Sequence, residues 1–260
     1  MKTRLLVVGY GRMAEAMLRG FAIHAPKLES YALQITGRNP EKIRSFLERL
    51  PLAVEILPPT PILDIDHATV LLAIKPYALE SFEYKGVASL VLSVLAGVSV
   101  GKLAKCLKSD AYARCMPNIA SSYALSSTTL YAPCAVPIKA RARALLECLG
   151  AVVEVSSEQL IDASLATNGS ALAFLGMMAQ GLVNAGVREG LSHDQAVMLV
   201  AQSFKGFTQL LQEKAPQEII DSICTPGGAT IAGLSVLEEK AFKGIIMRAC
   251  HAVVKKGRTP

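Results

Sequence analysis

The sequence lacks the side-chain clusters that bind metals or form disulfide frameworks. Its six cysteines stand far apart, with no Cys-x-x-Cys pair and no neighbouring histidine that would suit zinc. The four histidines are also isolated, and no His-Glu-x-x-His pattern occurs. We therefore expect no metal site, and thiols that stay reduced in the cytoplasm. The cysteines are Cys106, Cys115, Cys134, Cys148, Cys224 and Cys250.

The chain also has little that would suit a membrane or a nucleic acid. The apolar run from Val87 to Val98 has 12 residues, fewer than the ~20 that cross a bilayer. Residues 1–9 already contain a strand-like run, so we expect no signal segment. The net charge of +6 is scattered, without a basic block, so it suits a phosphorylated cofactor and an acidic substrate better than nucleic acid.

Catalytic pairs of two common dehydrogenase classes are missing as well. None of the seven tyrosines has a lysine four residues later, which argues against a short-chain dehydrogenase. No lysine lies between Lys139 and Lys205, where a β-hydroxyacid dehydrogenase places its catalytic lysine. Reduction of a carbonyl needs an acid for the oxygen, whereas a basic cyclic imine can arrive already protonated. The missing proton donor therefore favours hydride transfer to a small anionic cyclic imine.

The order of predicted elements indicates an α/β protein with two domains. Up to about residue 156, short β-branched runs alternate with helix-like stretches, which predicts a parallel sheet with crossover helices, a Rossmann-like domain over residues 1–156. From 157 to 260 the sequence is rich in alanine and leucine, which predicts an all-helical substrate and dimerisation domain. The expected strands are 5–8, 33–36, 54–57, 70–74, 90–94, 111–115, 128–131 and 152–155.

A glycine-rich turn follows the first expected strand and opens a helix. Gly9-Tyr10-Gly11-Arg12-Met13-Ala14 has the G-x-G-x-x-A spacing of a dinucleotide-binding turn. The first glycine makes the tight turn, the second lets the backbone approach a pyrophosphate, and the alanine lets the helix lie close to the sheet. A purely structural turn has the same spacing, but its place in an N-terminal βαβ unit favours a cofactor.

The residues after the second and fourth strands bear on which cofactor is bound. The second strand ends in Thr36-Gly37-Arg38-Asn39-Pro40-Glu41-Lys42, without the acid that would bind the 2′-hydroxyl of NAD. Arg38 and Lys42 suit a 2′-phosphate instead, which predicts NADPH, with NADH as a poorer donor. Asn39-Pro40 and Ser99 have the pattern of helix starts. Ala73-Ile74-Lys75-Pro76 ends the fourth strand, where open α/β sheets bind ligands.

Two segments of the helical half offer free backbone amides at a helix start. They are Asn168-Gly169-Ser170 and Thr225-Pro226-Gly227-Gly228-Ala229-Thr230, each suited to an anion or to simple capping. Ser192 is expected to cap another helix. The helix expected over 172–188 is small and apolar on nearly every side, so it is either central in one monomer or packed against a second subunit.

The segment 225–230 resembles the Ser-Pro-Gly-Gly-Thr/Ala-Thr signature of the pyrroline-5-carboxylate reductases. Further segments resemble the same family in the same order along nearly the whole chain. They are the turn at 9–14, Ala73-Ile74-Lys75-Pro76, residues 93–99, Arg114-Cys115-Met116-Pro117-Asn118 and Val236-Leu237-Glu238-Glu239-Lys240.

The resemblance implies a reductase that makes L-proline from 1-pyrroline-5-carboxylate with NADPH. It implies that Gly227, Gly228 and Ala229 hold the substrate carboxylate and that Thr230 faces the ring nitrogen. Glu213, matched by spacing, and the segment 168–170 are implied to contribute to the substrate site. The implied phosphate and nicotinamide contacts are 9–14, Arg38, Asn39, 73–76 and Val94-Leu95-Ala96. Family members form homodimers through C-terminal helices, often assembled into rings.

One segment departs from the family pattern. Where the family usually has Ser-Gly-Ser-Gly-Pro-Ala-Tyr, this chain reads Asn168-Gly169-Ser170-Ala171-Leu172-Ala173-Phe174. The sequence therefore leaves two alternatives to the reductase: a non-catalytic NADP(H)-binding paralogue, and a reductase of a related imine or hydroxyacid.

Overall fold

The computed structural model describes residues 2–258, which form two compact units. The first unit contains residues up to Ser170 together with the stretch from Val253, and the second contains Ala171–Ala252. The expected domain boundary was residue 156. The division instead follows α5 (Gln159–Ser164), because this helix packs on strands β8 and β9 of the first unit.

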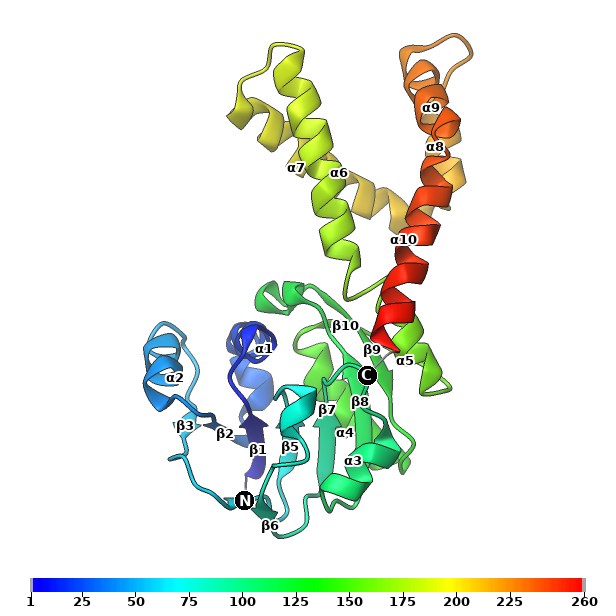
Figure 1. Ribbon diagram of the computed structural model, residues 1–260. Helices are drawn as coiled ribbons and strands as arrows, with labels where there is room; N and C mark the ends of the chain where they lie inside the picture. The colour runs from blue at the N-terminus through cyan, green and yellow to red at the C-terminus, as the bar shows by residue number, and fades with distance from the viewer. Residues whose placement is uncertain (1, 259–260) are drawn as a thin grey trace. The chain divides into compact units, whose positions relative to one another are not determined.

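Within residues 2–258, the first unit is built on a sheet of eight strands in the order β10-β9-β8-β7-β5-β1-β2-β3 (Figure 1). β1 is an interior strand, paired in parallel with β2 on one side and β5 on the other. The strands are β1 (Thr3–Val8), β2 (Tyr31–Thr36), β3 (Glu55–Ile56), β5 (Thr69–Leu72), β7 (Leu90–Ser93), β8 (Tyr112–Met116), β9 (Ser126–Tyr131) and β10 (Gly150–Glu154).

One strand pair departs from the parallel sheet expected from the sequence. β9 runs antiparallel to β8, and β10 follows the direction of β9. The connection from β8 to β9 is the short 3-10 helix η3 (Ile119–Tyr123), too short for the crossover that two parallel strands need. The chain therefore turns back beside β8, and the last two strands point the opposite way.

Each face of the sheet carries its own hydrophobic core. On one face the core is formed with α1 (Arg12–Ile23), α2 (Pro40–Leu47) and α4 (Val136–Glu147), and its largest fully buried side chain is Phe21. On the other, Leu6 and Val8 of β1 pack with α3 (Val100–Cys106) and the chain between β3 and β5. That chain includes β4 (Leu63–Asp64), which pairs with β6 (Tyr84–Lys85) in a small second sheet. Both faces of β1 are thus buried, as its continuous apolar sequence requires.

The helix starts expected at Asn39 and Ser99 are confirmed by their side-chain hydrogen bonds. Asn39 Oδ1 accepts from the amide of Lys42 at 3.0 Å, and Ser99 Oγ accepts from the amide of Lys102 at 3.1 Å. In both cases a side chain satisfies a first-turn amide that has no partner within its helix. Two further 3-10 helices, η1 (Ala25–Leu28) and η2 (Pro76–Ala78), complete the first unit.

The second unit is entirely helical, as expected. Its helices are α6 (Ala171–Arg188), α7 (His193–Glu213), α8 (Pro216–Ile223), α9 (Ala229–Glu239) and most of α10 (Phe242–Gly257). The start at Ser192 is confirmed, because Ser192 Oγ accepts from the amide of Gln195 and Gln195 Oε1 accepts from the amide of Ser192.

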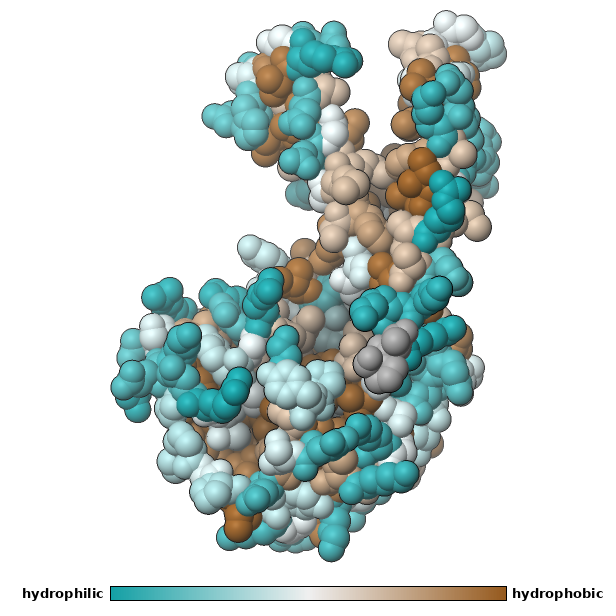
Figure 2. Space-filling view, in the orientation of Figure 1, coloured by the Kyte–Doolittle hydropathy of each residue, from teal (hydrophilic) through white to brown (hydrophobic). Residues whose placement is uncertain are grey.

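The helices of the second unit leave most of their apolar side chains exposed. Among the described residues of α6 none is buried, so this helix does not form the centre of a monomer core. Hydrophobic side chains gather over the helices of this unit in Figure 2. Met177, Met198 and Met247 are each more than 70% exposed. Such a surface is typical of a unit that buries its apolar face against another chain. No helix among residues 2–258 has the length and apolar character needed to cross a bilayer.

Candidate functional site

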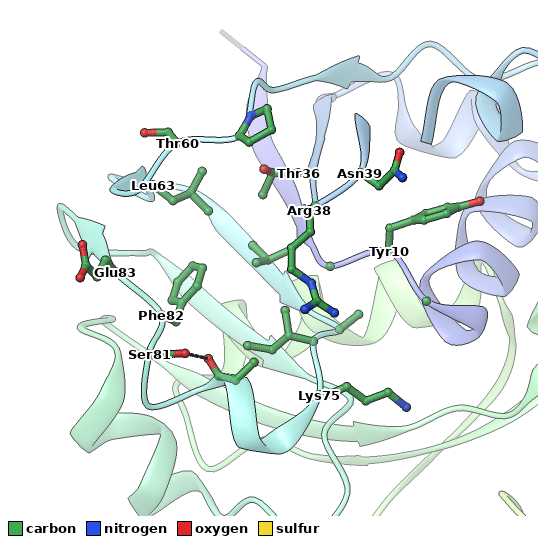
Figure 3. Close-up of a pocket in the computed structure, with 18 of the residues that line it drawn as sticks. Tyr10, Thr36, Arg38, Asn39, Thr60, Leu63, Lys75, Ser81, Phe82 and Glu83 are labelled. Carbon is green, nitrogen blue, oxygen red and sulfur yellow. Dashed lines mark hydrogen bonds between the residues drawn. The ribbon is translucent and has the colours of Figure 1, made fainter. Parts of the chain in front are cut away.

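A cavity of about 660 Å³ opens at the carboxyl ends of β1, β2 and β5 (Figure 3). This is the edge at which open α/β sheets bind ligands, because the loops after neighbouring parallel strands diverge there. The cavity brings together three segments that the sequence analysis selected separately. It is lined by Gly9, Tyr10 and Gly11, by Arg38, Asn39 and Lys42, and by Ala73, Ile74 and Lys75.

Gly9 is required by the fold of the turn after β1. Its φ angle is +104°, a conformation that other residues rarely adopt, and a Cβ there would lie 2.7 Å from the carbonyl oxygen of Ala73. The Gly9 amide donates to the carbonyl oxygen of Thr36, and the Ala73 amide donates to that of Val8. The turn is therefore packed against the ends of both neighbouring strands.

Gly11 differs from Gly9, because the protein itself does not require a glycine there. Its φ of −135° is open to any residue. Within the described part of the chain, nothing lies within 4 Å of where its Cβ would be. Gly11 stands immediately before α1 and lines the cavity. A side chain would occupy cavity space beside the first amides of a helix, so the missing side chain suits the close approach of a ligand.

Arg38 and Lys42 give the cavity a positive wall. Within residues 2–258 neither side chain forms a salt bridge, and both line the cavity at the end of β2. In Figure 3 the Arg38 guanidinium reaches from the β2 loop across the carboxyl ends of the strands. Two unpaired cations beside a helix start suit a phosphate group.

The side chain of Tyr10 turns away from this wall. Its ring lies 5.9 Å from that of Phe46 on α2, and the Arg19 guanidinium lies 5.0 Å from the Phe46 ring. Burial, and then the negative charge of Glu15, raise the pKa of the Tyr10 hydroxyl. Tyr10 therefore stays neutral and connects the glycine turn to the helix that carries Lys42.

Other residues expected at the cofactor site do not line the cavity. Arg12 lies in a smaller hollow with Glu15 and Arg19. Ala14 is a buried residue of α1. Met13 and Val94 pack at the edge of the sheet core. Leu95 is buried and Ala96 is exposed. Pro76 is the first residue of η2 and does not line the cavity.

One whole wall of the cavity was not expected from the sequence. It comes from the chain between β3 and β5, from η2 and from the residues after η2, which follow no recognisable turn pattern. The one available signal was the proline-rich stretch Pro58-Pro59-Thr60-Pro61, which is typical of a stiff loop. The wall consists of Pro59, Thr60, Pro61, Leu63, Tyr77, Ala78, Ser81, Phe82 and Glu83.

Asn168 is held inside the first unit by its side-chain amide. Its Oδ1 accepts from Asn118 Nδ2 at 3.0 Å and from Ser127 Oγ at 2.9 Å, and its Nδ2 donates to the carbonyl oxygen of Met116. Asn168 is buried, Gly169 is exposed, and the Ser170 amide donates to the carbonyl oxygen of Leu165. The Asn168 side chain therefore fixes the loop that leads to Ala171.

In the second unit, the glycine-rich segment forms the start of α9. Gly227 has a φ of +72°, and Gly228 stands immediately before the helix without a side-chain cap. Ala229 and Thr230 are the first residues of α9. Their amides have no carbonyl group four residues earlier within the helix to bond, so they are free to bind a ligand. Thr230 is exposed. Glu213, at the end of α7, is exposed, and its Oε1 accepts from Gln209 at 3.4 Å.

Three thiols of the first unit are held in their protonated, less nucleophilic form. Burial raises the pKa of the thiols of Cys115, Cys134 and Cys148, so these groups stay protonated at neutral pH. Across residues 2–258 no three metal-ligating side chains gather at one point.

Sequence comparison divides the chain much as the structure does. A sequence model described as NADP oxidoreductase coenzyme F420-dependent matches residues 4–97, and one described as pyrroline-5-carboxylate reductase dimerisation matches residues 158–259. The second match covers the helices with the exposed apolar side chains. Together the two observations indicate that the chain forms an oligomer.

Comparison with individual proteins covers the full length. The chain is 48% identical to the pyrroline-5-carboxylate reductase of Helicobacter pylori over 255 residues, 98% of both chains. It is 33% identical to that of Thermus thermophilus over 260 residues, 98% of this chain and 97% of the other. The crystal structure of 1-pyrroline-5-carboxylate reductase from Streptococcus pyogenes matches with a TM-score of 0.82 at 27% identity, covering 100% of this chain and 99% of that one. The chain belongs to the pyrroline-5-carboxylate reductase family.

Proposed function

We propose that this protein is the pyrroline-5-carboxylate reductase of proline biosynthesis, which reduces 1-pyrroline-5-carboxylate to L-proline with NADPH. The observation that carries the proposal is the cavity at the ends of β1, β2 and β5, where a glycine turn meets two unpaired cations. Identity of 48% over nearly the whole of a curated pyrroline-5-carboxylate reductase supports the same reaction.

The residues of the cavity fit NADPH. Bound there, the cofactor supplies a hydride. Gly9 and Gly11 would leave room for its pyrophosphate beside the first turn of α1, and Arg38, Asn39 and Lys42 would hold the 2′-phosphate. Ala73, Ile74 and Lys75 of the cavity lining would hold the cofactor beyond its pyrophosphate. Pro76, Val94, Leu95 and Ala96 would contact the nicotinamide, and Arg12, Met13 and Ala14 would support the turn. NADH lacks the 2′-phosphate and is therefore the poorer donor.

Replacing Arg38 with alanine tests the choice of cofactor. A charge-assisted hydrogen bond contributes about 1.5–3 kcal/mol, so we expect the KM for NADPH to rise roughly 10- to 100-fold. The KM for NADH should stay within about twofold, because that cofactor has no group for Arg38 to bind. Arg44→Ala is the matched control, since it removes the same charge from α2 outside the cavity lining. Equal losses with both cofactors would contradict this role for Arg38.

The proposed reaction needs little proton transfer by the protein, because the imine nitrogen is already protonated. Hydride adds to the carbon of the protonated C=N bond, the π electron pair moves to the nitrogen, and proline results. Gly227, Gly228 and Ala229 hold the substrate carboxylate at the positive end of α9, and the Thr230 hydroxyl hydrogen-bonds the ring nitrogen. The Gly228 amide already donates to the Thr225 carbonyl oxygen, so the free amides come from its neighbours. Glu213, Gly169 and Ser170 complete the substrate site. Asn168 contributes by fixing the loop, because its own amide is already bonded.

The proposed assembly is a homodimer through the C-terminal helices, extended to a ring of dimers. The exposed apolar side chains of α6, α7 and α10 support such an interface. The proposed location is the cytoplasm, which agrees with six cysteines that are all free thiols.

The proposal is tested with purified protein, NADPH and 1-pyrroline-5-carboxylate. We expect NADPH consumption matched by an equal amount of L-proline, measured by absorbance and chiral chromatography. NADPH binding without turnover of any cyclic imine would identify a non-catalytic paralogue instead. Turnover of other imines alone would identify a different reductase.

A further inference from the structure

The loop between β7 and α3, residues 94–99, is fixed from outside its own segment. Leu95 and Val98 are buried, while Ala96 and Gly97 between them are exposed. On the β7 side, the Leu95 amide donates to Ser93 Oγ at 3.2 Å. On the α3 side, the Val100 amide donates to Glu158 Oε1 at 2.6 Å across 58 residues of sequence. Glu158 is therefore the distant anchor of the loop.

Glu158 is itself held by a buried arginine. Arg114 on β8 is 3% exposed and makes two salt bridges, to Glu158 Oε1 at 3.2 Å and to Asp162 Oδ1 at 2.9 Å. The Glu158 carboxylate thus lies between the guanidinium and the start of α3. Ser99 satisfies the Lys102 amide and Glu158 satisfies the Val100 amide. Without Glu158, the first amide of α3 would lose its partner.

We propose that Glu158 is a positioning residue for NADPH, which acts by fixing residues 94–99 through the Val100 amide. This inference rests on the proposed function, which assigns residues 94–96 to nicotinamide binding. A loop held rigid before the cofactor arrives costs less ordering entropy on binding. The bond from Glu158 to Val100 supplies that rigidity at the α3 end of the loop.

The chain contains a matched control. Asp162 binds the same guanidinium at a similar distance and is similarly exposed, 21% against 24% for Glu158, but it has no bond to the loop. Both substitutions to alanine remove one of the two salt bridges of Arg114. Only the change at Glu158 also removes the partner of the Val100 amide.

The experiment compares Glu158→Ala, Glu158→Gln and Asp162→Ala. We expect Glu158→Ala to raise the Kd and the KM for NADPH about tenfold, the loss of one charge-assisted hydrogen bond, with the KM for the pyrroline unchanged. Glu158→Gln keeps an acceptor for the Val100 amide and should stay within about threefold of the original protein. Asp162→Ala should change the Kd by no more than about twofold, although its Tm should fall through the loss of one salt bridge of Arg114.

Hydrogen exchange without cofactor separates this inference from the proposed reaction. The amides of residues 94–100 should exchange faster in Glu158→Ala and not in Asp162→Ala, whichever substrate the enzyme uses. If Glu158→Ala fails to fold, Glu158→Asp provides the same test, because it keeps the charge near Arg114 but withdraws the acceptor. Equal effects of the Glu158 and Asp162 changes on NADPH affinity, or unchanged exchange in residues 94–100, would overturn the inference.

Discussion

Replacing Gly9 with alanine is expected to lower the free energy of unfolding by about 3–5 kcal/mol. The reason is local, since the new Cβ would lie 2.7 Å from the Ala73 carbonyl oxygen and 2.8 Å from its carbon, in a backbone conformation at φ +104°. Backbone atoms of two adjacent strands have no room to move apart. A loss of this size is a large part of the ~5–15 kcal/mol that stabilises a typical domain. Thermal unfolding followed by circular dichroism measures it, with a Tm expected to fall by roughly 10 °C.

Gly11→Ala is the matched control for Gly9→Ala. Since the space around Gly11 is open and its φ is −135°, its stability should change by less than about 1 kcal/mol. Its NADPH affinity should nevertheless fall at least about tenfold, because the methyl group enters the proposed pyrophosphate position. Fluorescence titration of NADPH measures this. A stable Gly9→Ala protein, or a Gly11→Ala protein with full affinity, would contradict the roles given to these glycines.

Replacing Thr230 with alanine is expected to lower kcat about 100-fold, the usual loss for one donor at a reacting centre. The hydroxyl is proposed to hydrogen-bond the ring nitrogen as its bonding changes, so its loss should affect the chemical step more than binding. The Kd for NADPH should stay unchanged, because Thr230 does not line the cofactor cavity. Steady-state rates and NADPH titration on the same samples separate the two effects.

Two variants of α9 control this experiment. Thr230→Ser keeps a hydroxyl at the same position and should retain most of the activity. Ser235→Ala removes a hydroxyl that bonds only the Ile231 carbonyl oxygen of its own helix, and should leave kcat unchanged. If Thr230→Ala turned over as fast as Ser235→Ala, Thr230 would have no part in the reaction.

The features predicted well from the sequence all depend on neighbouring residues. The glycine turn, the first strands and the helix starts at Asn39, Ser99 and Ser192 follow from patterns a few residues long. The Rossmann-like fold and the helical second half are confirmed for the same reason. The individual roles of Thr230 and Glu213 remain predictions.

The features missed depend on pairing between distant parts of the chain. The reversal of β9 follows from the length of the η3 connection, which periodicity does not reveal. Asn168 was selected for its helix start, whereas its side chain bonds Asn118, Ser127 and Met116, some 40 to 50 residues earlier. No local sequence pattern indicated a role for Glu158, because its two partners, Val100 and Arg114, lie far away in sequence.

The central claim is that hydride passes from NADPH, bound at the ends of β1, β2 and β5, to the C=N carbon of 1-pyrroline-5-carboxylate. The most direct measurement uses NADPH with deuterium at the transferable position, followed by mass spectrometry and NMR of the product. We predict L-proline with one deuterium on the ring carbon that was double-bonded to nitrogen, formed about tenfold more slowly by the Gly11→Ala protein at low NADPH. Proline without deuterium, or no proline at all from the unchanged protein, would contradict the account.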